Sequence, residues 1–324
     1  MLNLFLSGRG RTIFILPVLI LIFGIKSFVQ PLLLVDSPSY IFSLLDSFFI
    51  NNDWIKLIIG FFILALVAFY VNQVFNSNGF YSTENTLPSL LFVLMACAWT
   101  GFHFFSPLML SLLFILKAIN SLLNVYHQKN ILSDVFDAGL FLGFAAILYY
   151  PLALFILSFW LFISFNRAFS FREYFFPLLG LSLPFFFMGV VFFYFDIPLD
   201  FINFPKTEVV DSLISYGSLS QRIFLVICVL AFVLSLPFFI KQNNRAKVKT
   251  KNAGRFILVF LINALLIYVF AHSFFPIHNR ELILVLPLVF IIPFYFYNVS
   301  PLFKDLLFYF WLIAALFFNI FPSV

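Results

Sequence analysis

The chain has 324 residues and a formal net charge of +5, and 64% of its residues are hydrophobic whereas only 10% are charged. A soluble domain has about a quarter charged and about half apolar residues, so this chain has too few polar side chains to cover a globule in water. The composition excludes a water-soluble enzyme, a disordered chain and a nucleic-acid-binding protein. We therefore predict an integral membrane protein whose surroundings are membrane lipids.

Apolar stretches follow one another along the whole chain. A transmembrane helix needs about 20 mostly apolar residues, and two of the stretches are too long for one helix. Each of these is expected to form two helices, with breaks at Ser106-Pro107 and at Tyr149-Tyr150-Pro151, because proline cannot donate a backbone hydrogen bond. We predict one all-α integral membrane domain over residues 1–324, with about 11 transmembrane helices. The expected spans are 12–34, 54–75, the two halves of 87–126, the two halves of 134–166, 174–195, 222–240, 254–273, 281–298 and 302–320.

The positions of the charges predict the orientation, because basic residues favour the cytoplasmic side of a membrane. With a cytoplasmic N-terminus and alternating spans, cytoplasmic segments hold 13 of the 18 basic residues and the opposite side holds 8 of the 13 acidic ones. Residues 241–253 are expected to form a basic cytoplasmic loop. The first apolar run is too long for a signal peptide, and no small-residue cleavage site follows it, so we interpret it as a retained helix. The predicted location is a bacterial inner (cytoplasmic) membrane, crossed many times.

The first candidate site residues on the predicted outer face are acidic. Asp36 directly follows the first span and precedes a segment, about 37–53, that is expected to form an amphipathic helix in the outer interface. A carboxylate at this depth could act as a general base, or hold a divalent metal, in a reaction of a lipid-linked donor. Asp36 could equally cap the helix, since Ser37-Pro38 is a typical helix start. Asp46 and Asp53 are further candidates that could simply face water.

A second group of polar residues lies in the segment AHSFFPIHNRELILVLPLVF. Arg280 stands at the outer start of a span, where basic residues are disfavoured. Its guanidinium suits the phosphate of a polyprenyl-phosphate head group, with His278 as a second donor; alternatively, Arg280 forms a structural ion pair with Glu281 or another acid. His272 and His278 are six positions apart, which does not make a metal pair on a helix, and no metal site is predicted.

Two features of the segment 134–148 favour structural roles. Asp134 and Asp137 stand at the start of a predicted span, where acids stabilise the positive end of the helix dipole, although their shared face also fits a binding role. Gly139 and Gly143 form a small-xxx-small pair, which predicts close contact with another helix. The basic loop could hold anionic lipid head groups, and orientation alone explains it equally well.

Taken together, this layout resembles the GT-C superfamily, the polytopic membrane glycosyltransferases that use polyprenyl-phosphate-linked sugars. The resemblance depends on an outer-loop acid before a juxtamembrane helix, on paired spans that turn at GFHFFSP and YYP, and on a glycine-containing helix before a turn in DAGLFLGFAAILYYPLALFIL. The segments PLLGLSLPFFFMGVVFFYF and HNRELILVLPLVFII look like later spans of that superfamily. The chain also resembles small GT-C-like membrane proteins of Bacteroidota.

The resemblance implies that Asp36 is the base or metal ligand and that Arg280 contacts the lipid phosphate. The sequence departs from the family pattern because its outer acids are spread out, because Glu281 replaces an aromatic residue, and because no large C-terminal outer domain is present. The leading hypothesis is transfer of a polyprenyl-phosphate-linked sugar in envelope glycan or glycoprotein synthesis, at the outer face. A non-catalytic subunit or scaffold of an envelope or secretion assembly, with membrane-protein partners, is the alternative. A lipid or small-solute transporter is the third; whether the chain is an enzyme at all is left open.

Overall fold

The structure is a computed structural model that describes Phe5 and residues 15–29, 41–42, 53–81, 83–99, 105–126, 131–166, 170–196, 219–274 and 281–320. These residues form helices and short turns, with no strand among them, which confirms the predicted all-α class. In chain order the helices are α2 (Ile15–Val29), α4 (Asp53–Ser77), α5 (Leu87–Trp99), α6 (Pro107–Asn124), α7 (Leu132–Leu148), the 3-10 helix η2 (Tyr150–Phe155), α8 (Ile156–Asn166), α9 (Phe171–Tyr194), α11 (Leu219–Arg245), α12 (Val248–Phe274), α13 (Leu282–Ile291), α14 (Pro293–Asn298) and α15 (Pro301–Ile320).

Five of the described helices are long and apolar enough to cross a membrane, and shorter apolar helices accompany them. The structure therefore has the helices of an α-helical membrane protein, while the number of about 11 spans stays a prediction. The five are Trp54–Ser77, Pro107–Asn124, Phe171–Tyr194, Ile223–Arg245 and Val248–Val269; the shorter ones are Leu87–Ala98, Tyr150–Asn166 and Leu282–Asn298.

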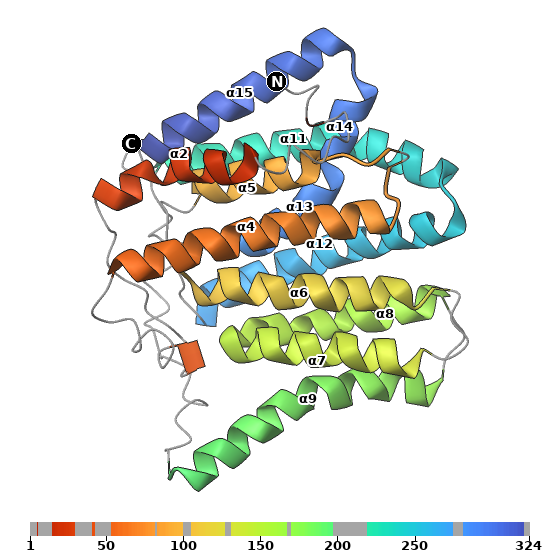
Figure 1. Ribbon diagram of the computed structural model, residues 1–324. Helices are drawn as coiled ribbons and strands as arrows, with labels where there is room; N and C mark the ends of the chain where they lie inside the picture. Colours follow the sequence, from red (N-terminus) through yellow and green to blue (C-terminus); the bar gives the residue numbers. More distant parts are fainter. Residues whose placement is uncertain are drawn as a thin grey trace.

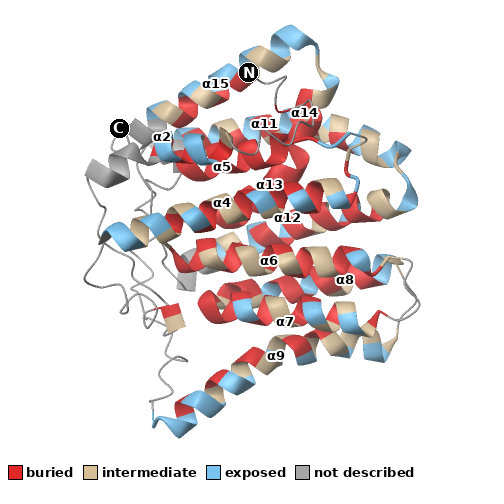
Figure 2. Ribbon diagram, in the orientation of Figure 1, coloured by how far each residue is buried: buried red, intermediate tan, exposed pale blue. Residues whose placement is uncertain are grey.

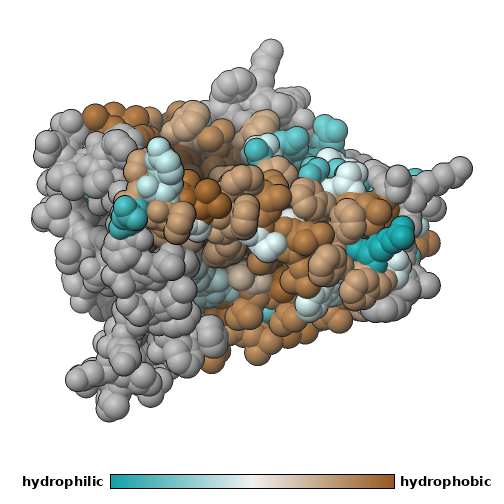
Figure 3. Space-filling model, turned by 90° about the horizontal axis from the view of Figure 1, so that it is seen from below, coloured by the Kyte–Doolittle hydropathy of each residue, from teal (hydrophilic) through white to brown (hydrophobic). Residues whose placement is uncertain are grey.

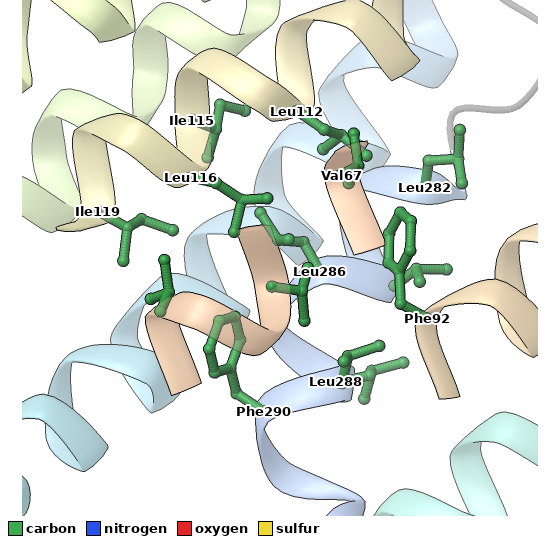
Figure 4. Packing of buried hydrophobic residues seen from close by; sticks show 14 of the residues in the cluster. Val67, Phe92, Leu112, Ile115, Leu116, Ile119, Leu282, Leu286, Leu288 and Phe290 are labelled. Carbon is green, nitrogen blue, oxygen red and sulfur yellow. The ribbon is translucent and has the colours of Figure 1, made fainter. Parts of the chain in front are cut away.

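The helices form an antiparallel bundle in which helices that follow one another in the chain run back and forth between two ends (Figure 1). One series of packed neighbours runs from α9 through α7, α6, α4 and α5 to α15. The second series joins α8 to α12, α13 and α11. Within it α13 is central, because each of its residues from Leu282 to Ile291 is buried. Figure 4 shows side chains of α4, α5, α6 and α13 meeting in this interior.

Much of the described surface of the bundle is apolar. Large hydrophobic side chains are exposed on α2, α4, α9, α11, α12 and α15, and exposed residues line the outer faces of these helices (Figure 2). Phe193 on α9 is 87% exposed and Leu302 on α15 is 85% exposed. The described part of the face beneath α9 is likewise mostly hydrophobic (Figure 3). A soluble protein rarely exposes so much contiguous apolar surface, so lipid chains are the solvent for these faces.

Both predicted helix breaks are confirmed. Helix α6 begins at Pro107, and the Ser106 side chain accepts a hydrogen bond from the Met109 N–H at 3.1 Å, as an N-cap does. Helix α7 ends at Leu148 and η2 follows from Tyr150. Between α7 and α8 the backbone is not α-helical, so some of its carbonyl groups lack an α-helical hydrogen bond. In lipid no water can replace that bond, and another part of the protein has to donate to these carbonyls.

A buried asparagine of α12 supplies such a partner. The Nδ2 of Asn263 donates to the Leu154 carbonyl of η2 at 2.9 Å and to the Ser158 hydroxyl at 2.8 Å. Asn263 is only 6% exposed, so water does not replace these bonds. The polar side chain inside an apolar helix thus joins α12 to the break between α7 and α8.

The expectation of a loop over 241–253 is wrong in its local structure. Helix α11 continues to Arg245 and α12 begins at Val248, so only Ala246 and Lys247 connect them. Lysine, arginine, glutamine and alanine are good helix formers, which allows both helices to extend beyond their apolar segments. The two helices are close at this end, because a Cβ on Gly254 would lie 2.7 Å from the Asn243 Cγ.

Close packing of α7 against α9 confirms the role predicted for Gly139 and Gly143. A Cβ on Gly139 would lie 2.7 Å from the Pro177 Cα, and one on Gly143 would lie 2.7 Å from the Leu181 carbonyl oxygen. In return, a Cβ on Gly180 of α9 would lie 2.7 Å from the Leu140 backbone nitrogen. Glycine on both helices therefore brings the two backbones together.

Replacing Gly139 with alanine is expected to push α7 and α9 apart and to destabilise the protein by about 1–3 kcal/mol, because the obstacle is backbone. The measurement is the midpoint of thermal unfolding of the purified protein in detergent. Gly189→Ala is the matched control on the exposed part of α9, since nothing lies within 4 Å of a Cβ there. Equal midpoints for the two variants would show that the α7–α9 contact does not require glycine.

Candidate functional site

The structure describes only part of the outer site that the sequence predicts. Asp53 is the first residue of α4, and its side chain lies outside the described part. Of the interface helix predicted over 37–53, only residues 41, 42 and 53 are described. The remaining proposed side chains, apart from Glu281, lie outside the described residues: Asp36, Asp46, His278 and Arg280.

Glu281 is the member of the predicted site that the structure places. It is half-buried at the N-terminal end of α13, and its carbonyl oxygen accepts the N–H groups of Leu284 at 2.9 Å and Val285 at 3.1 Å. Helix α13 is surrounded by α5, α11 and α12, so Glu281 stands where the central helix of the bundle begins. The start of α4 and the end of α9 lie at the same end of the bundle as the start of α13 (Figure 1).

The opposite end of the bundle holds the starts of α7 and α9, each with an acid in its first turn (Figure 1). These acids are Asp134 and Glu173, and both are engaged in interactions. Their position at helix N-termini is the one predicted for Asp134, where the helix dipole favours a negative charge.

A polar cluster in the connection between α4 and α5 was not predicted. Asn76 and Asn85 bond each other across this connection, since the Asn76 Nδ2 donates to the Asn85 carbonyl at 2.9 Å. The Tyr297 hydroxyl of α14 donates to the Asn85 Oδ1 at 2.6 Å. The Tyr297 ring stacks on Tyr81, with ring centroids 3.8 Å apart. The local sequence NSNGFYSTENT is typical of a turn and could have indicated the connection, but not its partner 212 residues away.

The same connection is fixed to α12 and contains a left-handed glycine. Gly79 has φ +63°, a conformation that costs glycine little, and its carbonyl accepts the Thr250 hydroxyl at 3.5 Å. Burial raises the pKa of the Tyr81 phenol above its ordinary value, so the phenol stays neutral at physiological pH. The groups assembled here are amides, hydroxyls and phenols, and we assign the cluster a structural role: it holds α4, α5, α12 and α14 together.

Next to this cluster the surface has a small hollow lined by polar and aromatic side chains. Its free space is about 10 Å³, which is room for about one water molecule and not for a ligand. The lining residues are Phe80, Phe239, Gln242, Asn243, Ala246, Thr250 and Phe294.

Among the described residues, His, Cys, Asp and Glu do not gather in a group of three or more that could hold a metal ion. Both cysteines, Cys97 and Cys228, are buried and form no disulfide. Within the described part, the side chains that are polar and fully buried are all uncharged, and most are Asn or Ser.

The chain matches no protein-family model, no curated protein and no solved structure. The class that the structure itself defines is an α-helical membrane protein with a lipid-facing surface of apolar side chains.

Replacing Tyr297 with phenylalanine is expected to lower the stability by about 1–3 kcal/mol, because the Asn85 Oδ1 loses a donor in a site that is 1% exposed. The measurement is again the thermal unfolding midpoint in detergent. Tyr295→Phe is the control, since the Tyr295 hydroxyl makes no hydrogen bond within the described part of the chain. If the two variants unfold at the same temperature, the cluster does not hold the helices together.

Proposed function

We propose that the protein handles a polyprenyl-phosphate-linked sugar at the outer face of a bacterial inner membrane, as a GT-C-like membrane protein. The sugar would be transferred in the synthesis of an envelope glycan or glycoprotein. In this proposal Arg280 and His278 bind the lipid phosphate, and Asp36 acts as the base or metal ligand. Asp46, Asp53 and Glu281 are the other candidate polar groups of this proposed site.

The observation that supports this proposal most is the position of α13. Arg280 directly precedes Glu281, the N-cap residue of α13, in the chain, and in this proposal its guanidinium acts at the N-terminal end of this central helix. The N-terminus of a helix carries partial positive charge and free N–H groups, and both favour a phosphate. A guanidinium at this point adds a full positive charge with paired donors. Helix α4, which Asp53 begins, starts at the same end of the bundle (Figure 1).

The test is binding of a polyprenyl phosphate to the purified protein in nanodiscs. Arg280→Ala is expected to weaken binding about ten-fold or more, because a charge-assisted hydrogen bond contributes about 1.5–3 kcal/mol. Arg172→Ala is the matched control, since Arg172 is an exposed arginine at the opposite end of the bundle. Equal loss in both variants, or no loss in Arg280→Ala, would contradict the phosphate assignment.

Asp36→Asn separates catalysis from binding. It is expected to keep the affinity for the polyprenyl phosphate while sugar transfer falls to background, because a carboxamide is no base. Sugar transfer is measured in membranes from cells that produce each variant at equal protein level. If transfer persists in Asp36→Asn, the catalytic role of Asp36 is wrong.

A second candidate function is a non-catalytic subunit that binds partner helices, and the shape of α9 favours it. The C-terminal half of α9 diverges from α7 (Figure 1). Its buried contact with α7 is a small hydrophobic cluster in which Met188 and Phe192 pack with Ile147. Phe186, Phe187, Val190 and Val191 on this half are exposed. If both Asp36→Asn and Arg280→Ala are fully functional while Phe187→Ala on α9 is not, this second function replaces the first.

A further inference from the structure

The end of the bundle opposite the predicted site carries a concentrated positive charge. The connected ends of α11 and α12, residues 241–255, contain six basic residues and no acid, and we call them the basic turn. Within the described residues none of these six side chains makes a hydrogen bond or an ion pair. They are Lys241, Arg245, Lys247, Lys249, Lys251 and Arg255.

The hairpin and the helices packed against α12 contain no acid: α11, α12, α8, η2 and α13 have neither aspartate nor glutamate. Helix α15, which packs against α11, carries Asp305, and none of the six cations forms an ion pair with it. The hollow beside the basic turn is lined by amides, a hydroxyl and aromatic rings, and it has no carboxylate. The counter-charge must therefore come from outside the hairpin.

The positions of Lys241 and Arg255 relate the basic turn to the lipid-facing surface of the bundle. On α11, Lys241 follows Leu234 by seven residues, which is two helical turns, so both belong to one exposed face. On α12, Arg255 precedes the exposed Ile262 by seven residues in the same way. Each cation thus continues a stripe of lipid-facing aliphatic side chains and lies about 10 Å beyond it along the helix.

A cation that follows a lipid-facing stripe lies at the depth of the lipid head groups, and its aliphatic stem can rest on the acyl chains. A water-side partner, such as an acidic protein, would meet Lys247 and Lys249 at the tip of the hairpin first. We propose that the basic turn is a binding surface for anionic phospholipid head groups, with Lys241 and Arg255 as its principal contacts. Basic residues near an anionic membrane surface attract such lipids by about 1 kcal/mol each, roughly five-fold in affinity.

The test compares two variants of equal charge. Lys241→Gln with Arg255→Gln neutralises the two stripe positions, whereas Lys247→Gln with Lys249→Gln neutralises two tip positions of the same hairpin. The full-length protein is released from nanodiscs of mixed phosphatidylglycerol and phosphatidylcholine, and native mass spectrometry measures the lipids that stay bound. Glutamine preserves helix propensity, and the thermal unfolding midpoint reports whether each variant is folded.

The wild-type protein is expected to retain phosphatidylglycerol in preference to phosphatidylcholine. The stripe variant should lose this preference by about five-fold for each charge removed, and the tip variant should lose less. The proposal is overturned if the wild-type protein has no preference, or if the tip variant loses as much as the stripe variant. Displacement of phosphatidylglycerol by soluble polyglutamate would also overturn it, because the surface would then serve an acidic partner in water.

Discussion

The absence of water inside the hydrocarbon is the constraint on which the rest of this structure depends. Every backbone carbonyl and N–H must find a partner within the protein, so an interruption of a helix has to be repaired by a side chain. The interruption at Tyr149–Phe155 is repaired by Asn263 of α12, which joins two segments more than 100 residues apart. The asparagines at the connection of α4 and α5 do the same at the edge of the bundle. The described interior has few polar residues, and most of these buried side chains form a hydrogen bond with another group of the protein.

The same constraint sorts the charges to the two ends. Charged side chains are costly in hydrocarbon, so they gather where helices begin and end. One end carries the basic turn and, on other helices, the acids in the first turns of α7 and α9, and the opposite end carries the start of α13 (Figure 1). The described interior between them holds apolar side chains and a few neutral polar ones. The two proposals made above, binding of phospholipid and of a lipid-linked sugar, use opposite ends of the bundle.

The features that the sequence predicted well are those that depend on local chemistry. Proline at 107 and 151 marked the helix breaks, and the spacing of Gly139 and Gly143 marked a close contact, because these residues act through backbone geometry alone. The loop over 241–253 was wrong, since hydropathy shows where a helix leaves the apolar medium and not where it ends. The bond between Tyr297 and Asn85 joins distant segments and leaves no local pattern. The outer site remains a set of predictions, because Asp36, Asp46, His278 and Arg280 lie outside the described residues.

The short connection between α11 and α12 also bears on how the chain enters the membrane. Two helices joined by two residues cannot separate by more than the reach of that connection, so they enter the bilayer as a hairpin. The connected ends of this hairpin carry six cations, and a charge is costly in hydrocarbon, so these ends stay at a membrane surface while the apolar parts of both helices lie in the lipid. The partner of the Asn263 amide inside this apolar medium is η2, a segment that precedes α12 in the chain. The chain order therefore supplies the partner of this amide before the amide itself is made.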